Sequence, residues 1–132
     1  MSKLNCVLLI DDDPITNSIN ERLFRKLQIS ERIEVKNNVD EAIEYLQKNI
    51  GNDNWKCPEI ILVDIKMPGK NGFEFLERFT TMNIFNKESV KTFILSSSDD
   101  LDDLSQSFRY KLNGYIVKPL TERKILSLIL EN

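Results

Sequence analysis

Hydrophobic residues fall along the chain in short runs separated by longer mixed stretches. Four runs are almost continuously apolar, at residues 7–10, 60–63, 93–95 and 115–117, and a fifth at 33–35 is weaker. Continuous apolar character, without alternation, is typical of parallel strands that helices cover on both faces. We therefore expect five buried strands.

The first helix is expected directly after the first strand. Asp13 suits the N-cap, and Pro14 suits the first helical position. Apolar residues then recur at every fourth position over residues 15–27. This spacing predicts an amphipathic helix, and it leaves Asp13 with a capping role.

The second helix is expected over residues 39–50. Asn38 and Glu41 have the spacing of a capping box, and Gly51 follows as a stop signal. The apolar stripe between these signals fits one buried helix face.

Three further helices follow from weaker patterns. They cover residues 73–79, 101–112 and 125–129, and Thr121 can cap the last one. The apolar stripes of the five helices are Ile15, Ile19, Leu23 and Leu27; Val39, Ala42, Ile43, Leu46 and Ile50; Phe73, Leu76 and Phe79; Leu101, Leu104, Phe108 and Leu112; and Ile125, Leu126 and Ile129.

Strands that alternate with helices at this spacing predict an α/β fold with right-handed crossovers and a doubly wound parallel sheet. Five strands favour the flavodoxin-like order 2-1-3-4-5. The segments 51–59, which contains Trp55, and 82–89 show no clear period and are expected to be surface loops. No linker or repeat divides the sequence, so residues 1–132 are expected to form one domain without an output module.

Composition narrows the chemistry that this domain can perform. The chain has 132 residues, 41% hydrophobic and 30% charged, with a net charge of -3 and scattered basic residues, so direct nucleic-acid binding is not expected. No segment resembles a membrane helix or a signal peptide, which favours a cytoplasmic protein with Cys6 and Cys57 as reduced thiols. Histidine is absent, so histidine-based catalysis and histidine metal ligands are excluded.

Reactive side chains stand where the expected strands end. Asp11 and Asp12 follow the first strand, and Asp64 follows the third. Ser96 follows the fourth strand, and Lys118 follows the fifth. In an open α/β sheet the ligand crevice lies outside the carboxyl ends of the strands, so these side chains are expected to converge.

Each of these residues also has a simpler explanation. Asp64 precedes a turn, Ser96 could be a polar strand end, and Lys118 before Pro119 could be a solvated surface lysine. If these explanations held for all of them, four separate strand ends would carry an acid pair, an acid, a hydroxyl and a lysine by accident. A shared functional site explains the whole group better.

Carboxylates that crowd one crevice repel one another unless a cation compensates them. Mg²⁺ prefers oxygen ligands and often combines one or two carboxylates with phosphate oxygens. We expect Asp12 and Asp64 to bind Mg²⁺, with Mn²⁺ as the alternative ion, and Asp11 to act directly or through water.

An aspartate at such a crevice can also be a nucleophile that forms an aspartyl phosphate. The attacking carboxylate is already ionised near neutral pH, so no general base is needed. We assign this role to Asp64, with Lys118 and Ser96 compensating charge on the transferred group.

At these positions the sequence resembles the receiver domains of two-component response regulators, of the CheY-like type, over essentially the whole chain. The matching residues are the acid pair Asp11 and Asp12, the acceptor Asp64 with Met67, Pro68 and Gly69, the later Gly72, the hydroxyl of Ser96, and the pair Lys118 and Pro119.

The resemblance implies further roles. The backbone carbonyl of Lys66 would complete the protein's share of the metal shell, and the backbone N–H of Ser97 would bind the phosphoryl group. Ser96 and Tyr115 would form the switch pair, although tyrosine at a strand edge is common without such a role. The peptide bond before Pro119 would be cis.

The resemblance also implies partners. A sensor histidine kinase or a histidine phosphotransfer protein would supply the phosphoryl group, and a protein target would bind the face formed by helix four, strand five and helix five. Apart from its own modification the domain is not expected to be an enzyme. In this family the residues at the positions of Lys66 and Ser98 vary and influence the lifetime of the phosphoryl group. The Asn113–Gly114 pair and the long loop around Trp55 depart from the family pattern, and both concern the contacts with partners.

Three other functions would place an acidic cluster or a phosphate at the same end of such a sheet. A magnesium-dependent phosphatase of the haloacid dehalogenase type would need a second acid where Ile65 and Lys66 follow Asp64. A flavin binder would need a phosphate-binding loop where the sequence has three aspartates. A receiver-like module that binds partners without phosphate usually lacks an acid or the lysine, and this chain keeps them.

Overall fold

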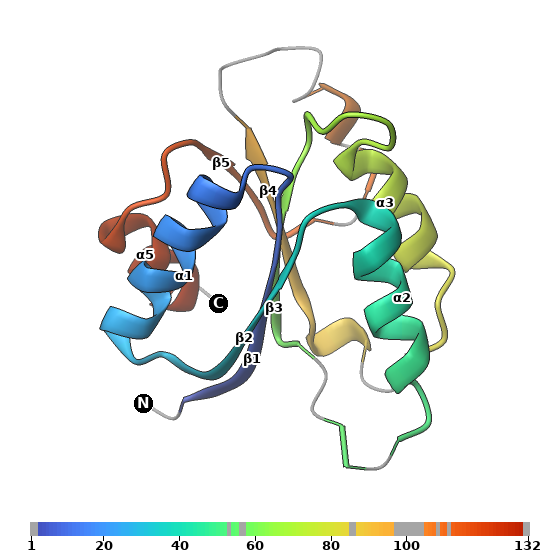
Figure 1. The fold of residues 1–132 in the computed structure, drawn as a ribbon, viewed down its shortest axis with the longest axis horizontal. Helices are drawn as coiled ribbons and strands as arrows, with labels where there is room; N and C mark the ends of the chain where they lie inside the picture. Colours follow the sequence, from blue (N-terminus) through green and yellow to red (C-terminus); the bar gives the residue numbers. More distant parts are fainter. Residues whose placement is uncertain are drawn as a thin grey trace.

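The computed structural model of the chain describes residues 3–52, 54–55, 58–84, 87–96, 105–107, 109–110 and 112–130. Strands and helices alternate along it (Figure 1). The elements are β1 (Leu4–Ile10), α1 (Pro14–Leu27), β2 (Ser30–Lys36), α2 (Val39–Asn49), β3 (Ile60–Asp64), α3 (Gly72–Thr80), the 3-10 turn η1 (Lys87–Ser89), β4 (Lys91–Ser96), β5 (Gly114–Val117) and α5 (Glu122–Leu130).

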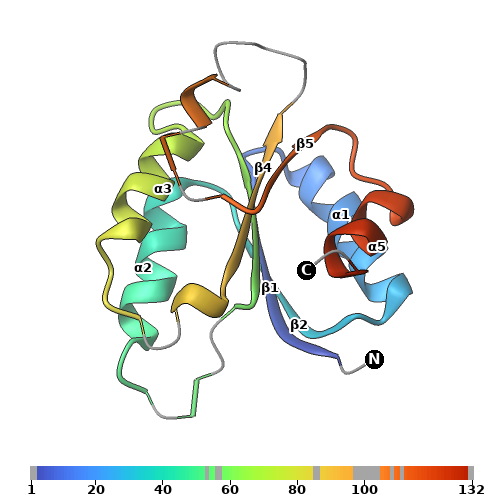
Figure 2. The ribbon, with the colours of Figure 1, turned by 180° about the vertical axis from the view of Figure 1, so that it is seen from behind.

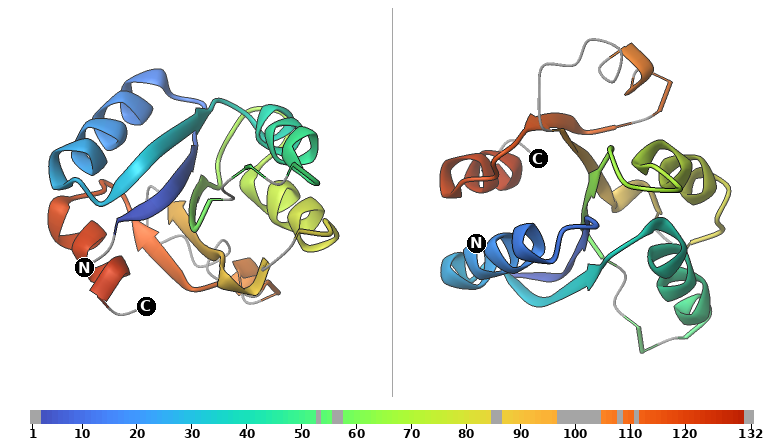
Figure 3. Two further views of the ribbon diagram at one scale, coloured as in Figure 1. Left: turned by 90° about the horizontal axis from the view of Figure 1, so that it is seen from below. Right: turned by 45° about the horizontal axis from the view of Figure 1, so that its top comes forward.

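The five strands form one parallel sheet in the order β2-β1-β3-β4-β5, which confirms the flavodoxin-like fold. Helices α1 and α5 cover one face, and α2 and α3 cover the other (Figures 1 and 2). The view from below in Figure 3 (left) shows the same three layers. The chain reverses its winding between β1 and β3, the place where ligands bind in such sheets.

The sheet has a hydrophobic core on each face. Leu8 and Ile10 of β1 belong to the core under α2 and α3, while Val7 and Leu9 belong to the core under α1 and α5. All five residues of β3 are buried. The apolar runs are therefore continuous because successive side chains enter opposite hydrophobic cores.

Helix α1 forms where it was expected, but its predicted buried stripe is wrong in part. Ile15 and Ile19 are 70% and 53% exposed, whereas the buried residues are Asn17, Asn20 and Phe24. A step of four residues overshoots one helical turn by about 40°, so a strict i+4 row winds around the helix. Only the later members, Leu23 and Leu27, reach the core.

The helix caps follow the sequence with one exception. The carboxylate of Asp13 accepts from the backbone N–H of Ile15 at 3.1 Å, and Thr121 Oγ1 accepts from the N–H of Lys124 at 3.2 Å. Asn38 caps α2, but Glu41 binds the side-chain amide of Asn38 and not its backbone, so the expected box is incomplete.

A complete capping box forms instead between Asn71 and Glu74 at the start of α3. At the other end of α2, Gly51 follows the C-cap residue with a φ of 89°, as expected for a stop signal. Two stripe members, Ile50 and Leu126, are exposed at 40% and 38% and not buried.

The two segments expected to be surface loops contribute to the core. Trp55 packs edge-on against Tyr45 with ring centroids 5.9 Å apart, and its indole N–H donates to the Tyr45 hydroxyl at 3.3 Å. Ile84 is buried near η1. Neither segment has a helical or strand period, so sequence patterning could not reveal these contacts.

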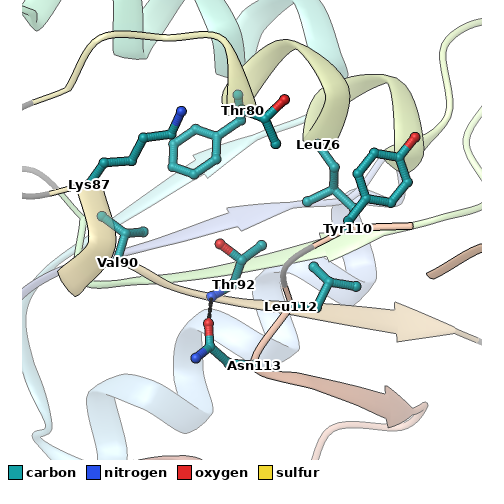
Figure 4. A pocket seen from close by; sticks show the side chains of 9 residues that line it. Leu76, Thr80, Lys87, Val90, Thr92, Tyr110, Leu112 and Asn113 are labelled. Atoms are coloured by element: carbon teal, nitrogen blue, oxygen red, sulfur yellow. Dashed lines mark hydrogen bonds between the residues drawn. The ribbon is translucent and has the colours of Figure 1, made fainter. Parts of the chain in front are cut away.

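The Asn113–Gly114 pair has a structural explanation. The Asn113 side chain accepts from the backbone N–H of Thr92 at 2.9 Å (Figure 4). The Asn113 N–H donates in turn to the Thr92 carbonyl at 2.8 Å. A Cβ atom on Gly114 would lie 2.9 Å from the ring of Phe93. The pair thus aligns β5 beside β4, next to a cavity of about 480 Å³ that Leu76 helps to line.

Some expectations fall partly outside the described residues. Residues 105–107 are helical, but Leu101, Leu104 and Phe108 of the fourth stripe are among the residues not described, as is Cys57. Cys6 is a buried free thiol. In the part of the chain that the structure describes, every helix is too short or too polar to cross a bilayer.

Candidate functional site

Three carboxylates come together at the turn after β1 and at the last residue of β3, where the next turn begins. One oxygen atom each of Asp11, Asp12 and Asp64 lies within 4.8 Å of the other two. Both turns lie at the top of Figure 1, where these parallel strands have their carboxyl ends. The convergence expected from the strand ends is therefore present for these acids.

Lys118 reaches the same cluster from the end of β5. Its ammonium nitrogen lies 2.9 Å from Asp11 Oδ2 and 3.2 Å from Asp64 Oδ1. Its backbone N–H donates to the carbonyl of Ser96 at 2.7 Å, which ties the lysine to the end of β4. The peptide bond between Lys118 and Pro119 is cis, as the resemblance implied.

A second lysine, which sequence reasoning missed, holds the turn that carries Lys118. The ammonium of Lys124 on α5 donates to the carbonyl of Val117 at 2.6 Å and to that of Pro119 at 2.9 Å. These two carbonyls flank Lys118. The only sequence signal was a lysine in the first turn of α5, which is a common feature without a contact of this kind.

Burial sets the electrostatics of the site. Asp64 is 4% exposed, and this burial, together with the charge of Asp11, raises the pKa of Asp64 to about 6. Burial disfavours the charged form of Lys118, but its contacts with Asp11 and Asp64 outweigh that effect and raise the pKa of the ammonium. The lysine therefore stays charged and compensates two buried carboxylates.

The donor set suits a hard divalent cation. Three carboxylates face one ammonium, so the cluster carries excess negative charge and offers oxygen ligands. Asp12 is exposed, whereas Asp11 and Asp64 are buried, which leaves one side of the cluster open to solvent. These residues therefore fit Mg²⁺.

The turn after β3 places α3 directly against Asp64. Gly69 has a φ of 77°, and Gly72 donates from its backbone N–H to the carbonyl of Ile65 at 3.0 Å. A Cβ atom on Gly72 would overlap the backbone carbonyl of Asp64. Glycine is therefore required at position 72 for the close approach of the helix. Lys66, the expected carbonyl ligand, lies in this turn.

The remaining predicted residues lie near the cluster or outside the described part. Ser96 is the buried last residue of β4 and pairs with Val117 of β5. Tyr115 lies on β5 beside Ile94 and is half-buried. Ser97, the expected phosphoryl-binding residue, and Ser98 are outside the described residues.

Comparisons with known proteins agree on one family. The family model described as "Response regulator receiver domain" matches residues 7–130. The transcriptional regulatory protein MalR of Bacillus subtilis is 28% identical over 113 residues, which cover 86% of this chain but only 43% of MalR. The two-component response regulator ARR22 of Arabidopsis thaliana is 27% identical, with 96% of this chain and 82% of that protein covered.

Solved structures give the same result. The crystal structure of a two-component response regulator from Cytophaga hutchinsonii matches with a TM-score of 0.84 and 32% identity, covering 98% of this chain and 96% of that one. The chain belongs to the family of response-regulator receiver domains, the signalling domains of two-component systems.

Proposed function

We propose that this receiver domain accepts a phosphoryl group on Asp64 from a phosphohistidine donor, in a Mg²⁺-dependent reaction. The observation that carries the proposal is the position of the Asp64 carboxylate, which is buried at a strand end 3.2 Å from the Lys118 ammonium and beside two further acids. Asp64 is the nucleophile, and its attack on phosphorus expels the imidazole of the donor histidine.

The chain's own residues orient the reaction. Lys118 approaches from β5 and compensates negative charge on the equatorial phosphoryl oxygens. Ser96 offers a hydroxyl from the end of β4. The phosphoryl-binding N–H is assigned to Ser97 from the resemblance, since this residue lies outside the described part of the chain. Asp11, Asp12, Asp64 and the carbonyl of Lys66 are assigned to the metal. When bound, Mg²⁺ supplies positive charge that offsets the crowded carboxylates and the incoming group.

A phosphoryl group on Asp64 would bias a two-state element between the site and the output surface. Ser96 and Tyr115 are the assigned switch pair, and they occupy neighbouring strands that pair in register. The assigned output face consists of the 101–112 segment, β5 and α5, where Val117 and Leu130 are exposed apolar residues.

A phosphohistidine donor must lie outside residues 1–132, because these residues contain no histidine. We assign this role to a sensor histidine kinase or a histidine phosphotransfer protein. We also propose that the domain acts without an attached output module. The support for this is the Cytophaga hutchinsonii response regulator, since 96% of that chain is matched. Apart from its own modification, the domain is proposed to have no enzymatic activity.

The test is intact-mass measurement after incubation with acetyl phosphate and Mg²⁺. We expect a labile gain of one phosphoryl group in the wild type. The gain should be absent in Asp64→Asn and in a chelator-treated sample. No gain in folded protein that binds Mg²⁺ would count against acceptance from small donors. If purified histidine kinases also failed, a phosphate-independent binding module would be the better description.

A further inference from the structure

A buried asparagine lies directly beneath the acid cluster. Asn17 on α1 is 4% exposed, although the sequence pattern placed it off the apolar stripe. Its side-chain amide donates to the backbone carbonyl of Asp11 at 2.7 Å. The same nitrogen lies 3.3 Å from Oδ1 of Asn37, in the connection between β2 and α2. One amide group therefore joins α1, the turn after β1 and the turn after β2.

We propose that Asn17 is a positioning residue for the metal site: it fixes the peptide bond that joins Asp11 and Asp12 and thereby sets the affinity of the acid cluster for Mg²⁺. This proposal rests on the assignment of the three acids to a metal in the proposed function. Asn17 itself is not assigned as a ligand.

The geometry explains how this fixation works. The carbonyl that Asn17 holds belongs to the peptide unit between the two acids, so its direction determines where the backbone of Asp12 leaves the turn. The other side of Asp11 is already fixed, because its N–H donates to the carbonyl of Lys36 at 3.2 Å. With both anchors in place, the carboxylates of Asp11 and Asp12 point into the same cluster as Asp64.

The side chain of Asp11 is also fixed by hydrogen bonds, one to each of its carboxylate oxygens. Its Oδ1 accepts from the N–H of Asp13 at 3.0 Å, and its Oδ2 accepts from the Lys118 ammonium at 2.9 Å. The Asn17 contact is therefore the anchor that reaches the acid turn from the interior of α1. Residues that orient metal ligands by hydrogen bonds, without binding the metal themselves, typically influence metal affinity.

Asn17 is not explained by stability alone. Its Oδ1 atom is buried without a hydrogen-bond partner within the described part of the chain. A buried acceptor that stays unpaired costs free energy, and an apolar residue of similar size would avoid this cost. The hydrogen bond from the Asn17 NH₂ group to the Asp11 carbonyl therefore explains the asparagine at this position better than packing does.

The neighbouring Asn20 provides a matched control. It lies on the same helix, is 5% exposed, and has no hydrogen bond to the acid turn in the described structure. Asn17→Ala and Asn20→Ala remove the same atoms from equally buried positions. A general loosening of α1 would affect both variants, whereas a loss of positioning would affect only Asn17→Ala.

The experiment measures Mg²⁺ binding by isothermal titration calorimetry on the full chain, without any phosphodonor. For Asn17→Ala we expect the Kd for Mg²⁺ to rise roughly tenfold. Loss of a residue that hydrogen-bonds to a metal ligand typically weakens metal binding by about 10-fold to 100-fold, and tenfold is the lower end of this range. For Asn20→Ala we expect the wild-type Kd. If Asn17→Ala does not unfold cooperatively, Asn17→Leu, with a similar side-chain volume, replaces it.

A second readout separates positioning from damage to the fold. The rate of phosphorylation by acetyl phosphate, measured over a range of Mg²⁺ concentrations, should require more Mg²⁺ in Asn17→Ala but reach a similar maximum. Equal Mg²⁺ affinity in the wild type and Asn17→Ala, or an equal loss in both asparagine variants, would overturn the proposal. If neither the wild type nor the variants accept a phosphoryl group, the proposed function fails. The Mg²⁺ Kd values of the wild type and the two asparagine variants still decide the role of Asn17 in that case.

Discussion

The ammonium nitrogen of Lys118 lies 3.2 Å from Oδ1 of Asp64 and at the same time 2.9 Å from Oδ2 of Asp11. One cation thus serves two buried carboxylates, with Asp12 close by. The free protein holds this arrangement at a cost, because like charges in a site of low polarity repel one another. The cost has measurable consequences for stability.

Replacement of Asp64 by asparagine should stabilise the metal-free protein at pH 7. The pKa of Asp64 is raised from 3.8 to about 6, so the folded protein binds this proton more tightly than the unfolded chain does. The ionised group therefore destabilises the fold above pH 6, and the penalty disappears as the pH falls toward 4. A shift of about two units corresponds to roughly 3 kcal/mol as an upper value.

Urea unfolding in the presence of a chelator measures this effect. Asp64→Asn should unfold at higher urea than the wild type at pH 7, and the two midpoints should approach each other at pH 4. Asp40→Asn is the control, because contacts with Lys70, and then Arg78, lower the pKa of Asp40. That variant should lose stability at pH 7. A stability gain for both variants would contradict the electrostatic explanation.

Removal of the Lys118 charge should destabilise the protein, whereas removal of the Asp64 charge should stabilise it. Lys118→Met leaves Asp11 and Asp64 without their cation, and loss of one partner from a buried ion pair typically costs about 3–5 kcal/mol. The loss should be largest at neutral pH in chelator and smaller below pH 5, where Asp64 is protonated. The free energy of unfolding from urea titrations at both pH values checks this.

An exposed lysine supplies the comparison for that variant. Lys26 forms a surface ion pair with Glu122 at 3.4 Å. Lys26→Met should change the free energy of unfolding by less than about 1 kcal/mol at either pH, because exposed pairs contribute little. A Lys118→Met variant as stable as Lys26→Met would mean that the acid cluster does not depend on the lysine.

Gly72→Ala should destabilise the protein and disturb Asp64. The added Cβ would overlap the backbone carbonyl of Asp64, which cannot move without shifting the end of β3. Overpacking of this kind typically costs about 1–3 kcal/mol. Gly69→Ala is the matched variant, since a Cβ there meets nothing within 4 Å and only the φ of 77° is unfavourable. The melting temperature of Gly72→Ala should be lower than that of Gly69→Ala. Acetyl phosphate should also phosphorylate Gly72→Ala more slowly than Gly69→Ala.

The orientation of α1 can be tested with substitutions on its two faces. Ile15→Ser and Ile19→Ser should each change the free energy of unfolding by no more than about 0.5 kcal/mol, because both side chains are exposed. Phe24→Ala should cost about 3–5 kcal/mol, since Phe24 is fully buried. Large losses in the isoleucine variants, measured by urea titration, would show that the helix buries the face predicted from the sequence.

The sequence was informative where topology alone determines position. Parallel strands place their carboxyl ends at one edge, so the meeting of Asp11, Asp12 and Asp64 follows from the order of the elements. The role of Asn17 could not be predicted, because a polar residue off the apolar stripe of a helix usually faces solvent. Side-chain to backbone contacts such as that of Lys124 depend on tertiary distances that no local pattern contains.

Trp55 is the only tryptophan of the sequence, and its contact with Tyr45 determines what its fluorescence can report. The indole lies in the connection that leads into β3, whereas Asp64 is the last residue of that strand. The two therefore stand at opposite ends of a strand about 15 Å long. Emission from Trp55 should follow the detachment of its segment from α2 during unfolding, and it should be a poor optical probe for metal or phosphoryl binding at the acids.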